Sequence, residues 1–135
     1  MIEVEVKLPV SDPVKILCLL MEEGFQLTDS RVERDTYFDN REGEIRASGE
    51  ALRVREVFDC LDGDAYAQMN YKGKKMDLRT ITRQELEISV YDGETCRQIL
   101  QSIGFHKVEP EVIKRRRLYQ KDDLQVSSFY AGNPE

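Results

Sequence analysis

The chain has 135 residues, which is enough for one domain with a single core but not for two. Its charged fraction of 34% and net charge of −6 are typical of a polar globular protein and argue against general nucleic-acid binding, which needs a basic surface. No apolar run approaches the roughly 20 residues of a membrane span. We therefore expect one domain over residues 1–135, with neither a nucleic acid nor a membrane as its partner.

Cysteine and histidine usage limits the redox and metal chemistry. Cys18, Cys60 and Cys96 are odd in number and widely spaced, which is typical of reduced thiols in a cytoplasm and not of a disulfide framework. The chain starts directly in a charged strand, so we expect no signal peptide. Because His106 is the only histidine, a His-rich metal site is excluded. Any metal must be held by carboxylates and water, which favours Mg²⁺ or Mn²⁺.

The first predicted element is an alternating strand, I-E-V-E-V-K-L. Side chains alternate between the two faces of a strand, so Glu3, Glu5 and Lys7 share one face and the apolar residues share the other. A half-buried surface strand gives the same alternation, with its charges in water. The arrangement returns several times downstream, which favours a functional face.

A helix follows, capped by Ser11 or Asp12 and ended by Gly24. The stretch R-D-T-Y-F-D at 34–39 is a short strand candidate, and the polar segment 40–50 is a predicted loop.

Two alternating strands around a turn at 62–64 predict a β-hairpin. Charged and amide side chains share one face of each strand. These residues are Arg53 and Arg55 on the first strand and Gln68, Asn70 and Lys72 on the second.

A further strand over 82–90 places Glu85 and Glu87 on one face. A second helix begins at Asp92 or Thr95 and stops at Gly104. The strand V-I-K-R-R-R-L-Y at 112–119 then places Lys114 and Arg116 on one face, with Arg115, Arg117 and Tyr119 on the other.

An internal repeat links the two halves of the chain. The order E-V-E-V, helix, Gly-Phe over 3–25 is echoed by E-L-E-I, helix, Gly-Phe over 85–105. Two such β-α-β halves could be related by an approximate two-fold axis and close into one sheet or barrel.

Faces that carry rows of both carboxylates and basic side chains are costly to bury unless a ligand matches them. A polyphosphate with a divalent cation supplies that match. Arginine forks and lysine ammonium groups bind phosphate oxygens, and carboxylates hold the metal.

Six sequence boxes occur in order: E-V-E-V-K, D-T-Y-F-D, L-R-V-R, Y-K-G, R-Q-E-L-E and K-R-R-R-L-Y. Over about residues 1–120 this pattern resembles the CYTH superfamily, the triphosphate tunnel metalloenzymes. That superfamily includes class IV adenylyl cyclases and thiamine triphosphatases, and the D-T-Y-F-D box looks most like the cyclase branch.

The resemblance implies an α+β fold, an antiparallel eight-stranded β-barrel or tunnel with helices packed outside. Tyr37 and Asp35 would shape the tunnel and not react. The implied catalytic set is Glu3, Glu5 and Lys7; the metal ligands are Glu3, Glu5, Glu85 and Glu87; the triphosphate contacts are Lys7, Arg53, Arg55, Lys72, Lys114 and Arg116.

The chain departs from the family pattern after K-D-D-L-Q-V, where it reads S-S-F-Y-A-G-N-P-E. The family's last acidic pair, closing strand and terminal helix have no counterpart in this stretch. We therefore expect an open edge in the tunnel, which the partner in a homodimer could cover.

Three functions fit these observations in a cytoplasmic protein. A cyclase would convert ATP to cyclic AMP and pyrophosphate, and a triphosphatase would release orthophosphate from a nucleoside, thiamine or inorganic triphosphate. A triphosphate-binding module without catalysis is the third. The resemblance favours the cyclase.

Overall fold

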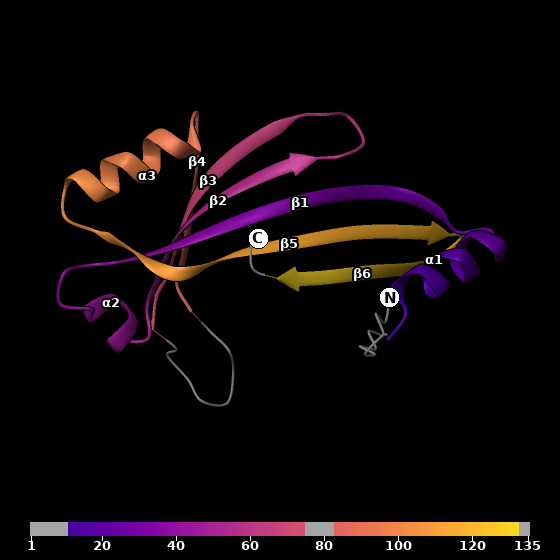
Figure 1. Cartoon of the computed structure of the whole chain (residues 1–135), viewed down its shortest axis with the longest axis horizontal. Helices are drawn as coiled ribbons and strands as arrows, with labels where there is room; N and C mark the ends of the chain where they lie inside the picture. Colours follow the sequence, from indigo (N-terminus) through magenta and orange to yellow (C-terminus); the bar gives the residue numbers. More distant parts are fainter. Residues whose placement is uncertain (1–10, 75–82, 133–135) are drawn as a thin grey trace.

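The computed structural model describes residues 11–74 and 83–132 of the chain (Figure 1). These residues form one mixed assembly of helices and antiparallel strands. In chain order the elements are α1 (Pro13–Glu22), β1 (Gln26–Asp39), α2 (Glu44–Ala47), β2 (Ala51–Asp59), β3 (Ala65–Lys72), β4 (Glu85–Val90), α3 (Gly93–Ser102), β5 (His106–Lys121) and β6 (Leu124–Gly132).

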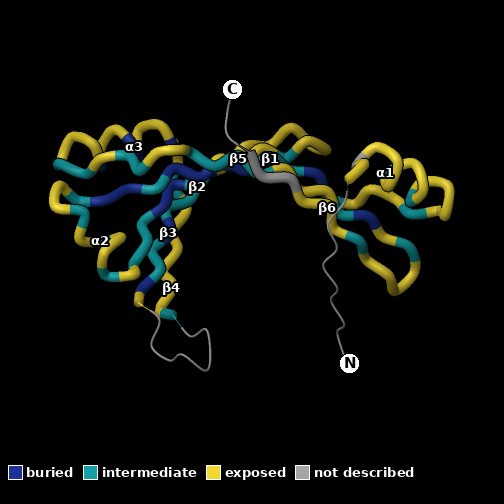
Figure 2. Tube along the Cα trace, turned by 60° about the horizontal axis from the view of Figure 1, so that its bottom comes forward, coloured by how far each residue is buried: buried dark blue, intermediate teal, exposed yellow. Residues whose placement is uncertain are grey.

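The six strands make a single sheet in the order β4-β3-β2-β1-β5-β6, and every neighbouring pair is antiparallel. The sheet bends into an arch, with α3 on its outer side and β4 and β6 at its two ends (Figure 2). The expected antiparallel α+β fold is confirmed. Over the described residues the sheet stays open between β4 and β6 and does not close into a tunnel. The expected homodimer stays a prediction.

The internal repeat is visible in the caps of the two long helices. The side chains of Asp12 and Asp92 each accept a hydrogen bond from a backbone N–H in the first turn. Gly24 and Gly104 end the helices at φ angles of +90° and +109°, which glycine adopts without a Cβ clash. The amide of the phenylalanine after each glycine donates to a helix carbonyl at 3.0 and 2.9 Å. Each cap leads into a long strand, and these strands, β1 and β5, pair with each other in the interior of the sheet.

Several predicted boundaries are wrong. The strand expected over 34–39 belongs to β1, which extends back to Gln26, and β5 begins at His106 instead of residue 112. Both strands lie in the interior of the sheet, where two neighbours supply backbone hydrogen bonds to segments of weak alternation. The tail 124–132 pairs with β5 as β6 through a two-residue turn, so this stretch does add a strand.

The polar segment expected as a loop over 40–50 contains the short helix α2. Asp39 at the end of β1 organises it: its carboxylate accepts hydrogen bonds from the amides of Asn40, Ile45 and Arg46 at 2.9, 3.0 and 3.3 Å. A carboxylate at a helix N-terminus satisfies amides that lack a partner within the helix. Capping of this kind leaves no trace in a hydrophobic pattern, so the sequence predicts only a polar loop over this segment.

The hydrophobic core lies on the outer face of the arch, between the sheet and α3. Phe38, Val54 and Leu100 are buried together there. Leu52, Met69, Cys96 and Phe105 pack around them. Alternation along β1 and β2 places Glu33, Asp35, Arg53 and Arg55 on the opposite, inner face. The inner face is where the charged residues of these strands lie.

Candidate triphosphate-binding site

Strand register brings charges of both signs together on the inner face. Asp35 of β1 is paired with Arg55 of β2, and Glu33 of β1 is paired with Lys114 of β5. Residues directly opposite one another on neighbouring strands point to the same side of the sheet. Arg53 and Arg55 therefore share one face of β2, as predicted, and Lys114 and Arg116 share the same face of β5. These two pairs flank β1 on its two sides.

Asp35 lies at the centre of this arrangement and is 0% exposed. The Arg55 guanidinium donates two hydrogen bonds to its carboxylate, from Nε at 2.7 Å and from Nη2 at 2.9 Å. Lys114 Nζ lies 3.4 Å from Asp35 Oδ2, and Arg53 Nη1 lies 3.9 Å from the same oxygen. One buried carboxylate thus faces three cations from two neighbouring strands.

Glu33, two residues earlier on β1, is the second buried carboxylate and is 2% exposed. Its Oε2 lies 3.3 Å from Arg55 Nη2 but accepts no hydrogen bond from the residues that the structure describes, and its Oε1 lies 3.7 Å from Arg116 Nε. The Arg116 guanidinium is half-exposed and stacks over the Phe129 ring at 5.4 Å. We refer to Arg53, Arg55, Lys114 and Arg116 as the cationic cluster.

The cationic cluster carries more positive charge than its two carboxylates neutralise. Four cations against Glu33 and Asp35 leave a surplus of two positive charges, 4 − 2, among these six side chains. Arg53, Arg55 and Lys114 are largely buried, so solvent screens this surplus poorly. An anionic ligand on the inner face would be strongly attracted.

An amide bridge extends the site toward β4. Arg53 Nε donates to Asn70 Oδ1 at 3.3 Å, and Asn70 Nδ2 donates to Glu87 Oε1 at 2.8 Å. Asn70 is buried, so both ends of its amide are held by these two partners. The bridge links a predicted phosphate contact to a predicted metal ligand across three strands.

The remaining predicted site residues lie further from the cationic cluster or outside the described residues. Lys72 and Glu85 are register partners on β3 and β4, on the same face as Arg53. In the described ranges, no group of three or more His, Cys, Asp or Glu side chains is arranged to hold a metal. The expected ligands and catalytic residues Glu3, Glu5 and Lys7 lie outside those ranges.

Three residues of the site had no predicted binding role: Glu33, Asp35 and Asn70. The family resemblance implies only that Asp35 shapes the tunnel, and it implies no role for Glu33. The spacing of Glu33 from Asp35 by two residues is the signal that could have identified the pair, because it places both on one face of a strand. Their partners come from β2 and β5, which only the sheet order reveals.

A separate group of ion pairs lies on the outer face of the sheet. The Arg34 guanidinium donates two hydrogen bonds to Glu111 Oε2, at 3.0 and 2.8 Å, and Lys107 Nζ lies 3.6 Å from Glu111 Oε1. Glu111 resembles Asp35 in being a carboxylate between cations, but alternation places Arg34 and Asp35 on opposite faces. These pairs therefore lie away from the cationic cluster.

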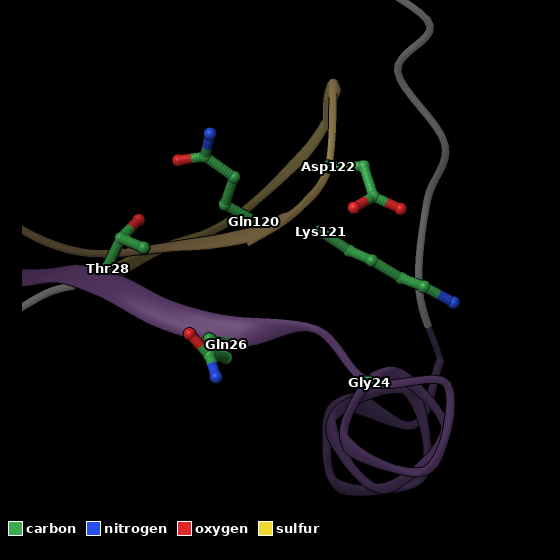
Figure 3. A pocket seen from close by; sticks show the side chains of 6 residues that line it. All are labelled: Gly24, Gln26, Thr28, Gln120, Lys121 and Asp122. Atoms are coloured by element: carbon green, nitrogen blue, oxygen red, sulfur yellow. The ribbon is translucent and has the colours of Figure 1, made fainter.

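A pocket of about 420 Å³ lies at the other end of the central strands, beside the hairpin between β5 and β6 (Figure 3). Its lining is mostly exposed and polar, and it holds none of the predicted site residues. The lining residues are Gly24, Gln26, Thr28, Gln120, Lys121 and Asp122. With a single cation beside a carboxylate, this pocket offers no excess charge for a polyanion.

Among the described helices, none has both the length and the apolar character of a membrane span.

Two opposing effects act on the pKa of Asp35. Burial disfavours its charged form and by itself would raise the pKa. The hydrogen bonds and charge of Arg55, with the charges of Arg53 and Lys114, outweigh burial and hold the pKa below its usual 3.8. A lowered folded-state pKa means that the ionised carboxylate stabilises the fold.

This shift predicts a pH-dependent stability. The contribution of Asp35 is fully present above its unfolded pKa and is lost as the pH falls through its folded pKa. We expect Asp35→Asn to lower the free energy of unfolding by roughly 3 kcal/mol at neutral pH, because it leaves three cations without their anion. The deficit should begin to shrink as the pH falls below about 4, the ordinary pKa of the unfolded carboxyl, and should disappear only when the pH has passed below the lowered pKa of the folded carboxyl. Urea unfolding at several pH values measures it, and a deficit independent of pH would refute this prediction.

Solved structures share this fold. A protein from Pyrococcus horikoshii superposes with a TM-score of 0.64 at 24% identity, over 85% of this chain and 64% of that one. A Vibrio parahaemolyticus protein, provisionally titled an adenylate cyclase, gives a TM-score of 0.58 at 13% identity, over 89% of this chain and 63% of that one. This chain therefore spans a little under two thirds of the length of these proteins.

Sequence relatives are more specific. A protein from Methanocaldococcus jannaschii, provisionally named an adenylate cyclase, is 36% identical over 94% of this chain and 69% of its own length. The profile of the CYTH domain matches residues 1–127, which is nearly the whole chain. The six sequence boxes, the antiparallel arch and the charged inner face agree with that match. The chain belongs to the CYTH domain family.

Proposed function

We propose that this chain binds a nucleoside triphosphate on the inner face of its sheet and acts as an adenylyl cyclase, converting ATP to cyclic AMP and pyrophosphate. The observation that carries the proposal is the cationic cluster, with its surplus of positive charge around two buried carboxylates. Membership of the CYTH family supports triphosphate chemistry. The names of the M. jannaschii and V. parahaemolyticus proteins favour the cyclase reaction.

Each side chain of the cationic cluster has a role in this proposal. The planar forks of Arg53 and Arg55 suit phosphate oxygens, which they can bind through two parallel hydrogen bonds. Lys114 adds a point charge from β5, and the half-exposed Arg116 lies where the inner face opens to solvent. Together they would orient the triphosphate and fix its register on the sheet.

The cyclase reaction places its new negative charge on pyrophosphate. The ribose 3′-hydroxyl releases its proton to solvent as its oxygen attacks the α-phosphorus, the bond from that phosphorus to the bridging oxygen breaks, and pyrophosphate leaves. Donors fixed in advance around the β- and γ-phosphates stabilise this developing charge. Because Arg53 is already held by its hydrogen bond to Asn70, this side chain needs little reorganisation during the reaction.

A divalent cation, Mg²⁺ or Mn²⁺, is part of the proposal. Glu85 and Glu87 supply hard carboxylate oxygens on the inner face of β4, and Glu87 is oriented by Asn70. Such donors fit these ions, with Glu3 and Glu5 proposed as the remaining ligands from the family pattern. When bound, the ion would offset phosphate charge. Lys7 and Lys72 are proposed as further phosphate contacts.

Product analysis tests the reaction. The chain is incubated with ATP and either Mg²⁺ or Mn²⁺, and the products are separated by chromatography. We expect cyclic AMP and pyrophosphate in equal amounts, with no product when EDTA is present. Orthophosphate with ADP would instead identify a triphosphatase, and binding without turnover would identify a non-catalytic module.

Arg116→Ala tests which face binds the triphosphate. The variant removes one charged contact, so triphosphate binding should weaken by about 1.5–3 kcal/mol, the scale of a hydrogen bond to a charged group. Arg115→Ala is the matched control, because the two neighbours have the same charge but point to opposite faces. Isothermal titration calorimetry measures both. Equal losses in the two variants would contradict binding at the inner face.

A further inference from the structure

The cationic cluster is already occupied by anions that belong to the chain. Asp35 takes both Nε and Nη2 of Arg55, at 2.7 and 2.9 Å, which are the atoms that a phosphate would use. Its Oδ2 also faces Lys114 and Arg53. A triphosphate that binds these cations must therefore take a position that the Asp35 carboxylate already occupies.

The carboxylates stabilise the cationic cluster when no ligand is bound. Buried cations without an anion are costly, and the cost rises when several share one poorly solvated site. Asp35 and Glu33 are the most deeply buried charges of the group, at 0% and 2% exposure. Asp35 keeps the guanidinium groups of Arg53 and Arg55 facing β1, and Glu33 does the same for Arg116.

The same carboxylates oppose a bound polyphosphate. Once phosphate oxygens neutralise the cations, Asp35 and Glu33 are left as buried negative charges close to another anion. Within the described part of the chain, Glu33 is incompletely satisfied even before that, because its Oε2 accepts no hydrogen bond there. A carboxylate with such contacts loses little free energy when an anion of better geometry binds its cationic partner instead.

We propose that Asp35 and Glu33 are built-in counter-anions that a triphosphate displaces from the cationic cluster as it binds. They act as positioning residues that stabilise the empty site while lowering its affinity. The proposal rests on the proposed function, since it concerns how the same site exchanges its anions. It also implies that product leaves more readily, because the carboxylates compete for the cations that pyrophosphate must vacate.

A purely structural role makes the opposite prediction for binding. If Asp35 only held the arginines in a productive geometry, its neutral variant would bind triphosphate more weakly. If it competes, the neutral variant is less stable without ligand but binds more tightly, because removing the charge costs more in the empty state than in the bound state. The sign of the affinity change therefore separates the two roles.

The test is calorimetric titration of the intact chain with inorganic tripolyphosphate, without a divalent metal, together with thermal unfolding with and without that ligand. We expect Asp35→Asn to lower the melting temperature of the free protein and to bind about fivefold more tightly or better. Glu33→Gln should shift affinity the same way by a smaller factor, and it carries the test if Asp35→Asn fails to fold. Glu111→Gln, which removes a comparably paired carboxylate from the outer face, should leave affinity unchanged.

The outcomes separate this inference from the proposed function. Wild-type binding with equal or weaker binding by the folded neutral variants would overturn the counter-anion role and leave the triphosphate site intact. A wild-type protein that binds no tripolyphosphate would overturn the proposed site itself. Tighter binding by Glu111→Gln to the same extent would also refute the inference, since the effect would then follow from net charge alone.

Discussion

The bidentate contact between Arg55 and Asp35 is the interaction on which the inner face depends. A buried carboxylate is tolerated only with partners, and a group of buried cations only with an anion. Asp35 meets both requirements, since it holds Arg55 directly and lies within reach of Arg53 and Lys114. Without it, β1, β2 and β5 would bring like charges together, and the centre of the sheet would be strained.

The cationic partners of the site could be predicted because strand alternation is a local property. The alternation in L-R-V-R and V-I-K-R-R-R-L-Y predicted which arginines and lysines share a face, and the register confirms those faces. The anions could not be predicted in the same way. That Glu33 and Asp35 receive cations from both sides depends on β1 lying between β2 and β5, and such an order involves residues distant in sequence.

The fold shows the same division between local and non-local information. The helix caps at Asp12 and Asp92 and the glycine stops after both helices were readable from the sequence, because each involves residues within one or two turns. The length of β1 was not readable, since its first half is polar and is ordered by pairing with β5. Strand β6 and helix α2 likewise follow from contacts that no periodic pattern reports.

A crystal structure of the chain with a non-hydrolysable ATP analogue and Mn²⁺ would show where phosphate oxygens lie relative to Asp35. We expect phosphates on the inner face, within hydrogen-bond distance of Arg53, Arg55 and Lys114, with the Arg55 fork turned from Asp35 to the ligand. Phosphates bound at the outer face, or an inner face still closed by the contact between Arg55 and Asp35, would contradict this expectation.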